Sequence, residues 1–125
     1  MELFSMEFEV VTGNHPPTIK PIQDRTIAVG EQLLLYVIPK DADGDRLRSG
    51  AENLPDNAEY FPFPVKVLKR AKRGYITRYT HVFRWTPRLR HIGVHNITFW
   101  MEDIDIATGL SKSRTTEEVT ITVIP

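Results

Sequence analysis

Apolar residues in this chain recur at every second position in several short segments, and this alternation restricts the fold more than any other feature. The clearest segments lie at residues 79–85, 95–101 and 119–123. A period of two places alternate side chains on opposite faces of a β-strand. No window of about eleven residues shows the 3.6-residue period and the caps of a helix. The chain is therefore predicted to be all-β, with about seven short strands forming an antiparallel two-sheet sandwich.

Two of the predicted strands have unusual sequences. Residues 18–29 form an irregular first strand in this prediction, interrupted by Pro21. Proline lacks the N–H that a strand ladder needs, so this strand is expected at a sheet edge or where the chain crosses between sheets. Residues 32–38 are apolar on both faces, because Leu34 and Tyr36 lie between the alternating positions. We therefore expect this strand to be covered on both sides.

Length and composition limit the class of protein. The chain has 125 residues, enough for a single domain with one core. Apolar residues make up 41% and charged residues 26%, as in globular rather than disordered chains. The formal net charge is zero, so the overall charge does not favour nucleic acid or a membrane surface as a partner. There is no cysteine, which excludes disulfides and thiolate metal sites.

Targeting signals are absent from the sequence. No segment approaches the roughly 18 apolar residues of a membrane span. The first residues lack the basic and long apolar regions of a signal peptide. The chain is therefore expected to be either a cytosolic protein or a module excised from a longer one.

The beginning of the chain has the composition of a junction between modules. Residues 13–17 contain two consecutive prolines, which stiffen the backbone. The strand-like residues 7–11 resemble residues 119–123 at the other end. Residues 1–13 are therefore predicted to be the end of a preceding module or a linker, and residues 14–125 a single domain. The alternative is that residues 7–11 are the first strand of this domain.

Three carboxylates alternate within five residues, at Asp41, Asp43 and Asp45, directly after the apolar segment at 32–38. Carboxylates this close repel one another, and a hard cation such as calcium would neutralise them. The alternative is a solvated turn, because Asp and Gly are also the residues that a sharp turn selects. An EF-hand loop is a third interpretation, but its sixth position is Arg46, where such a loop needs Gly.

Cations are concentrated between residues 66 and 90, where nine Lys or Arg residues and no Asp or Glu occur. Within this region a hairpin is predicted, with Gly74 at its tight turn. Such a patch favours a polyanion such as an acidic glycan. The expected contacts are Lys69, Arg70, Lys72 and Arg73. The alternative is a solvated hairpin whose cations keep its edges from pairing with other chains.

Signals for catalysis are weak. His91 and His95 are four residues apart, but Gly93 lies between them and the context is turn to strand, so they do not share a helix face as zinc ligands do. The chain contains no Gly-x-Ser-x-Gly, phosphate loop or dinucleotide fingerprint. Trp100 lies on the opposite strand face from Phe99 and is a candidate for an exposed aromatic that stacks on a sugar; the alternative is that it covers the second face of the sheet. No catalytic residue is predicted, and the chain is not expected to be an enzyme.

Several short motifs occur in a characteristic order along residues 14–125. They are Asn14-His15-Pro16-Pro17, Val29-Gly30-Glu31-Gln32-Leu33, Asp41-Ala42-Asp43-Gly44-Asp45, Asn53-Leu54-Pro55, Phe83-Arg84-Trp85-Thr86-Pro87, Gly93 and Asp103. This order resembles the cadherin-like, or putative Ig, modules repeated in bacterial and archaeal surface proteins and in dystroglycan. The resemblance implies a Greek-key β-sandwich of immunoglobulin-like or cadherin-like type.

The resemblance also implies a calcium site where one module meets the preceding one. In such repeats the ligands come from an Asn-containing linker, an acidic turn after the second strand and an Asp at the end of the sixth. Carried over to this sequence, they are Asn14, Asp41, Asp43 and Asp103, with Asp45 as a further ligand or a turn former. The acidic motif that faces the following module is missing, because Arg84-Trp85-Thr86-Pro87 occupies its region. Calcium is therefore expected only at the amino-terminal junction, with weak binding in an isolated module.

The function implied by the resemblance is that of a non-catalytic structural or adhesion module of a larger cell-surface or secreted protein. Calcium would hold neighbouring modules at a fixed angle. The expected partners are neighbouring modules of the same chain, another surface protein or a glycan, with no nucleic acid and no direct membrane insertion. The alternative function is a glycan- or polyanion-binding module that uses the hairpin at residues 66–90 or Trp100.

Overall fold

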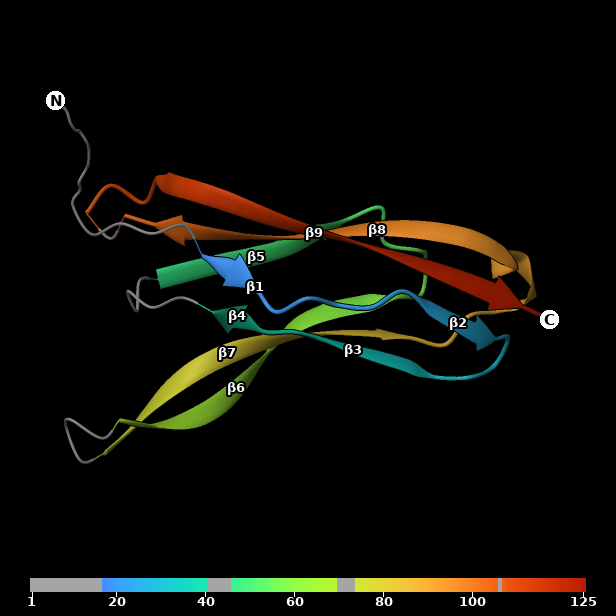
Figure 1. Ribbon diagram of the computed structural model, residues 1–125, viewed down its shortest axis with the longest axis horizontal. Coiled ribbons are helices and arrows are strands. Elements are labelled where there is room, and N and C mark those ends of the chain that lie inside the picture. The colour runs from blue at the N-terminus through green and yellow to red at the C-terminus, as the bar shows by residue number, and fades with distance from the viewer. Residues whose placement is uncertain (1–16, 41–45, 70–73, 106) are drawn as a thin grey trace, which may run out of the picture.

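The computed structural model describes residues 17–40, 46–69, 74–105 and 107–125, and two facing β-sheets dominate it (Figure 1). The first sheet contains, in spatial order, β2 (Arg25–Ala28), β9 (Ser111–Ile124), β8 (Gly93–Ile104) and β5 (Arg46–Glu52). The second contains β3 (Leu33–Val37), β7 (Gly74–Trp85) and β6 (Glu59–Lys69). Neighbouring strands are antiparallel except β2 and β9, which are parallel. The predicted all-β, immunoglobulin-like Greek-key sandwich is confirmed.

The first strand crosses between the sheets, as the position of Pro21 indicated. β1 (Thr18–Ile19) pairs with β4 (Pro39–Lys40), whereas β2 pairs with β9. β1 and β2 are thus two parts of one interrupted strand, and β3 and β4 are two parts of another. The nine strands of the described residues therefore correspond to the seven expected. A 3-10 helix at Leu89–His91 connects β7 to β8, and no helix in the described ranges is long and apolar enough to cross a membrane.

The core lies between the sheets and is built from the predicted alternating positions. Its largest fully enclosed side chains are Trp85, Phe83, Phe99, Leu35, Ile97, Met101 and Ile121. Phe83 of β7 and Phe99 of β8 meet edge to face, with ring centroids 5.7 Å apart. Burying one such side chain stabilises the fold by about 1.5–3 kcal/mol. The facing rows of the two sheets therefore hold the sandwich together.

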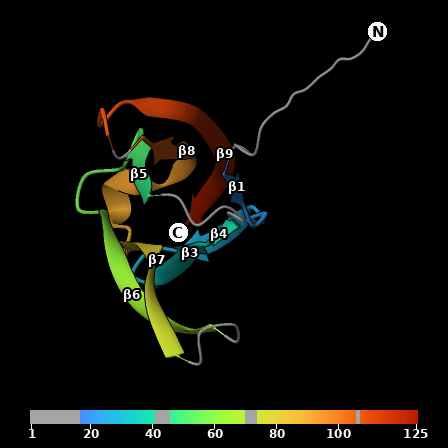
Figure 2. The ribbon, with the colours of Figure 1, turned by 90° about the vertical axis from the view of Figure 1, so that its left-hand side faces the viewer.

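The outer face of β3 is not covered, contrary to the prediction from its sequence. Leu34 is 39% exposed and Tyr36 is 52% exposed. Figure 2 views the sandwich along its length, with β3, β7 and β6 forming one layer and the other sheet packed on only one side of it. Apolar residues on both faces of a strand indicated double burial, but the second face of this strand has no partner layer among the described residues.

The hairpin of β6 and β7 extends beyond the sandwich. β3 pairs with β7 only at residues 81–85, but β6 pairs with β7 along residues 74–84. Residues 63–69 of β6 and 74–80 of β7 therefore project as a two-stranded ribbon, which we call the arm (Figures 1 and 2).

The two ends of the sandwich are distinct. At the end on the left of Figure 1, β1 begins, β4 ends, β5 begins, β8 ends and β9 begins. We call this the entry end. The last residues of β9 lie at the opposite end, the exit end.

At the exit end, a hydrogen-bond network joins the turn at residues 53–57 to the 3-10 helix. His91 is 4% exposed, and because the backbone N–H of Arg88 donates to its Nδ1 at 2.9 Å, its Nε2 donates to Asp56 Oδ1 at 2.6 Å. His95 Nε2 donates to the backbone carbonyl of His91 at 2.7 Å. Both histidines therefore have structural hydrogen-bond partners.

Asp56 makes this network sensitive to acid. Hydrogen bonds from Arg90 and His91 lower the pKa of its carboxyl from 3.8 to about 2. Because the folded-state pKa lies below the unfolded value, the contact stabilises the fold above about pH 4, and that contribution is lost as the pH falls toward about 2. We predict that the Tm difference between the wild type and Asp56→Asn, measured by scanning calorimetry, is largest near neutral pH and shrinks through this window.

Glu118→Gln is the control for this experiment, because it removes an exposed carboxylate of β9. We expect it to retain the acid dependence of the wild type. A Tm difference for Asp56→Asn that stays constant from neutral pH to about pH 2 would contradict the assignment.

Candidate functional site

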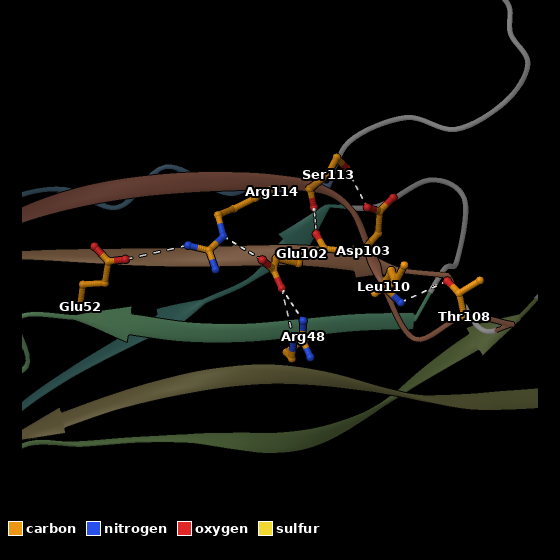
Figure 3. Close-up of polar contacts among 9 residues, drawn as sticks. Arg48, Glu52, Glu102, Asp103, Thr108, Leu110, Ser113 and Arg114 are labelled. Carbon is orange, nitrogen blue, oxygen red and sulfur yellow. Dashed lines mark hydrogen bonds and ion pairs between the residues drawn. The ribbon is translucent and has the colours of Figure 1, made fainter.

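Asp103 is the last member of the inward-facing row of β8, after Ile97, Phe99 and Met101. It is 0% exposed, and Ser113 of β9 donates its hydroxyl to Oδ1 at 2.7 Å (Figure 3). Its second oxygen, Oδ2, is buried and has no hydrogen-bond partner among the described residues. The inner row thus ends in a carboxylate with one oxygen left for a further ligand.

A buried carboxylate is unfavourable unless a cation or hydrogen-bond donors compensate it. Neither Arg48 nor Arg114 forms a hydrogen bond with Asp103. Arg48 and Arg114 donate to Glu102, which precedes Asp103 and therefore lies on the opposite face of β8 (Figure 3). These hydrogen bonds lower the pKa of Glu102, Arg48 having the larger effect. Among the described side chains, strand alternation thus gives the positive charge to the outer acid and none to the inner one.

Described residues that border the segments with the other predicted metal ligands lie near Asp103 in the sheet. Leu47 of β5 pairs directly with Asp103, so the connection from β4 enters β5 beside this carboxylate. The chain also enters the sandwich nearby, where the Thr115 hydroxyl of β9 donates to the Pro17 carbonyl. The predicted ligands that lie outside the described residues are Asn14, Asp41, Asp43 and Asp45. Within the described ranges no group of three His, Cys, Asp or Glu residues is arranged to hold a metal ion.

Trp100 is not a free aromatic platform, which corrects the sequence interpretation. A Cβ added to Gly50 would lie 2.3 Å from a carbon of the indole, so the ring occupies the space that glycine leaves open. The Arg114 guanidinium carbon lies 4.3 Å from the ring centroid. Trp100 is therefore part of a packed outer surface, together with the arginines that bind Glu102.

Tertiary contacts neutralise part of the basic region. Arg84 at the base of the hairpin donates to Glu59 at 2.7 Å, and Arg90 donates to Asp56. Both acids, Asp56 and Glu59, lie before residue 66 in the sequence and thus outside the range 66–90, which has no Asp or Glu. Of the nine cations, six lie within residues 63–80, a stretch that contains no acid.

Of the predicted polyanion contacts, the structure describes the backbone of Lys69 alone, which is the last residue of β6 and pairs with Gly74 in the ladder. The side chain of Lys69 lies outside the description, and so do Arg70, Lys72 and Arg73.

A hollow of about 510 Å³ lies at the exit end. Its lining residues are Val29, Gly30, Asn57, Thr86, Pro87, Arg88, Leu89 and Arg90. Arg90 is already paired with Asp56. The hollow is separate from Asp103, which lies at the entry end.

Comparison with known proteins shows the fold. No protein-family model and no curated protein matches the chain. An endo-fucoidan hydrolase of glycoside hydrolase family 107 is similar with a TM-score of 0.54 and 19% identity, over 92% of this chain and 14% of that one. The sialic acid binding region of a Streptococcus sanguinis adhesin is similar with a TM-score of 0.56 and 21% identity, over 91% of this chain and 31% of that one. The chain thus spans less than a third of either protein.

Proposed function

We propose that this chain is a non-catalytic module with a structural or adhesive role in a larger cell-surface or secreted protein. The sandwich fold supports this proposal. The two structural neighbours also support it, because the chain corresponds to only a small part of each and one of them is an adhesin region. Its partners are then neighbouring modules of the same chain, and another surface protein or a glycan.

The buried carboxylate of Asp103 is the observation that supports calcium at the entry end. Calcium takes roughly 6 to 8 oxygen ligands, mainly carboxylate, amide and carbonyl oxygens. Oδ2 of Asp103 supplies one oxygen that has no other partner among the described residues. The remaining side-chain ligands in this proposal are Asn14, Asp41, Asp43 and Asp45.

The role of such a site is mechanical. Calcium, when bound, would supply the positive charge that the Asp103 carboxylate lacks. Ser113 holds the other oxygen of this carboxylate and so fixes its orientation. The Thr115 hydroxyl donates to the carbonyl of Pro17, so the first described residue of the chain is already hydrogen-bonded to β9. Ligands shared between the linker and the sandwich then convert a hinge into a fixed angle.

We predict that calcium raises the Tm of the chain and that Asp103→Asn removes most of this increase. A site that is saturated at about 100 times its Kd adds about 2.7 kcal/mol to the free energy of unfolding. Scanning calorimetry in calcium chloride and in EDTA measures the effect. The substitution preserves side-chain volume but removes the negative charge and one of the two oxygens, which weakens calcium binding.

Glu102→Gln is the matched control, because it removes a carboxylate from the adjacent position on the other face of β8. We expect this variant to lose some stability with and without calcium but to keep the calcium-dependent increase. If Asp103→Asn responds to calcium as strongly as the wild type, Asp103 is not a ligand.

Glycan binding is a second candidate function, supported by the projection of the arm. Residues 63–80 contain six cations and no acid, and three of these cations belong to the arm. The arm extends past the end of β3, away from the acids that neutralise Arg84 and Arg90. A polyanion is the partner that such a charge distribution attracts. The two structural neighbours, an endo-fucoidan hydrolase and a sialic acid binding region, both have glycan ligands, which also supports this candidate.

We predict that the chain is retained on immobilised heparin and that replacing Lys69, Arg70, Lys72 and Arg73 with Gln makes it elute at clearly lower salt. The reason is that this variant loses four of the six cations of residues 63–80. Salt screens the attraction between exposed charges, so a protein with fewer cations elutes at lower salt. The control replaces three exposed cations outside the arm, Lys20, Arg25 and Arg88, with Gln. An equal loss of retention in both variants would mean that the arm has no special role.

A further inference from the structure

The outer face of the β3, β7 and β6 sheet carries a cluster of apolar and aromatic side chains, which we call the aromatic face. Its members are Leu34, Tyr36, Phe61, Phe63 and Val82. Tyr36 and Phe61 both pair with Val82, and Phe63 pairs with Thr80, so these side chains share one face of the sheet. Tyr36 and Phe61 stand two strand spacings apart, about 10 Å.

The aromatic face is exposed to solvent in the described structure. Tyr36 and Phe63 are each 52% exposed, and Leu34 is 39% exposed. Val82 lies on the same outer face but is only 5% exposed, because its aromatic neighbours cover it. A contiguous exposed apolar surface of this kind is uncommon on soluble proteins and typically marks a binding site.

Polar groups border the rings. The Arg84 guanidinium carbon lies 5.1 Å from the centroid of Phe61, and Arg84 also pairs with Glu59. Thr80 lies across from Phe63. Flat aromatic surfaces beside hydrogen-bonding groups are suited to sugars, whose C–H faces stack on rings while their hydroxyls bond to polar side chains. The hollow at the exit end includes none of these residues, and a surface outside a pocket favours an extended polymer over a small molecule.

The aromatic face is continuous with the basic arm, because the same two strands, β6 and β7, form both. Phe63 is the first residue of the arm, whose residues 63–69 and 74–80 include three cations and no acid. A ligand that lies along these strands meets rings first and positive charge next. Charge complementarity therefore selects a polymer with sugar rings and negative groups.

We propose that the aromatic face and the arm together bind an acidic polysaccharide, with Tyr36 and Phe63 stacking on its sugar rings. This proposal rests on the second candidate function and is independent of the calcium site at the entry end.

The test compares binding of dextran sulfate to the wild type and to the double variant Tyr36→Thr, Phe63→Thr. Threonine removes the ring while preserving the preference for a strand. Isothermal titration calorimetry is expected to show dextran sulfate binding weakened about tenfold, since two stacking contacts are lost. Because the arm cations remain, the dependence of log Kd on log salt should have the same slope in both proteins. Uncharged dextran, the same polymer without sulfate, should bind much more weakly to either.

The matched control is the double variant Leu89→Thr, Val94→Thr, which removes two side chains that are 75% and 64% exposed and lie outside this face. Its affinity for dextran sulfate should stay within about twofold of the wild type. Circular dichroism and the Tm check that each variant is folded. If the ring variant does not fold, Thr80→Glu replaces it, because this change keeps every ring and should weaken binding by repelling the sulfates.

The remaining outcomes overturn the proposal in distinguishable ways. If the ring variant binds dextran sulfate like the wild type, the aromatic face is not part of the site, and polyanion binding by the arm alone remains. If the wild type does not bind dextran sulfate at all, the second candidate function fails together with this inference. If the wild type instead self-associates in sedimentation experiments and the ring variant does not, the face is a contact between two copies of the chain.

Discussion

The sandwich depends on the packing of two inward rows against each other, Phe83 and Trp85 from β7 and Ile97 and Phe99 from β8. Because side chains alternate along a strand, this packing also determines which face of the sheet each remaining residue of these strands points to. It directs Asp103 inward at the end of the β8 row and Glu102 outward beside it. It likewise places Val82 on the outer face of β7. The candidate calcium ligand and the aromatic face are therefore both consequences of how the core is arranged.

Charges are distributed in space in a way that the linear sequence does not show. Arg84 and Arg90 belong to the basic stretch of the sequence, but Glu59 and Asp56 neutralise them in the fold. Asp56 also accepts from His91, so one acid connects a turn to the 3-10 helix. On the other sheet, Glu102 accepts from two arginines. Ion pairs between exposed groups contribute little stability. Here their effect is to neutralise two of the nine cations of the basic stretch, Arg84 and Arg90.

The proposed sites are compatible with each other because they lie on different parts of the module. Asp103 lies inside the entry end, whereas Tyr36 and Phe63 face solvent on the outside of the other sheet. In Figure 1 the arm extends toward the same end of the sandwich as Asp103. A calcium-fixed junction would therefore set the direction of the arm relative to a preceding module. An adhesive module needs such a direction if it presents a glycan-binding surface to a partner.

The sequence by itself determined the fold class and the inward rows, and it limited the first strand to a sheet edge or a crossing between sheets, because a period of two and the lack of an N–H at Pro21 act locally. Only the tertiary structure decided that Leu34 and Tyr36 remain exposed, that Trp100 is covered by Arg114, and that acids distant in sequence neutralise the base of the hairpin. Burial and ion pairing depend on which other segment lies opposite a residue, and local periodicity carries no information about that.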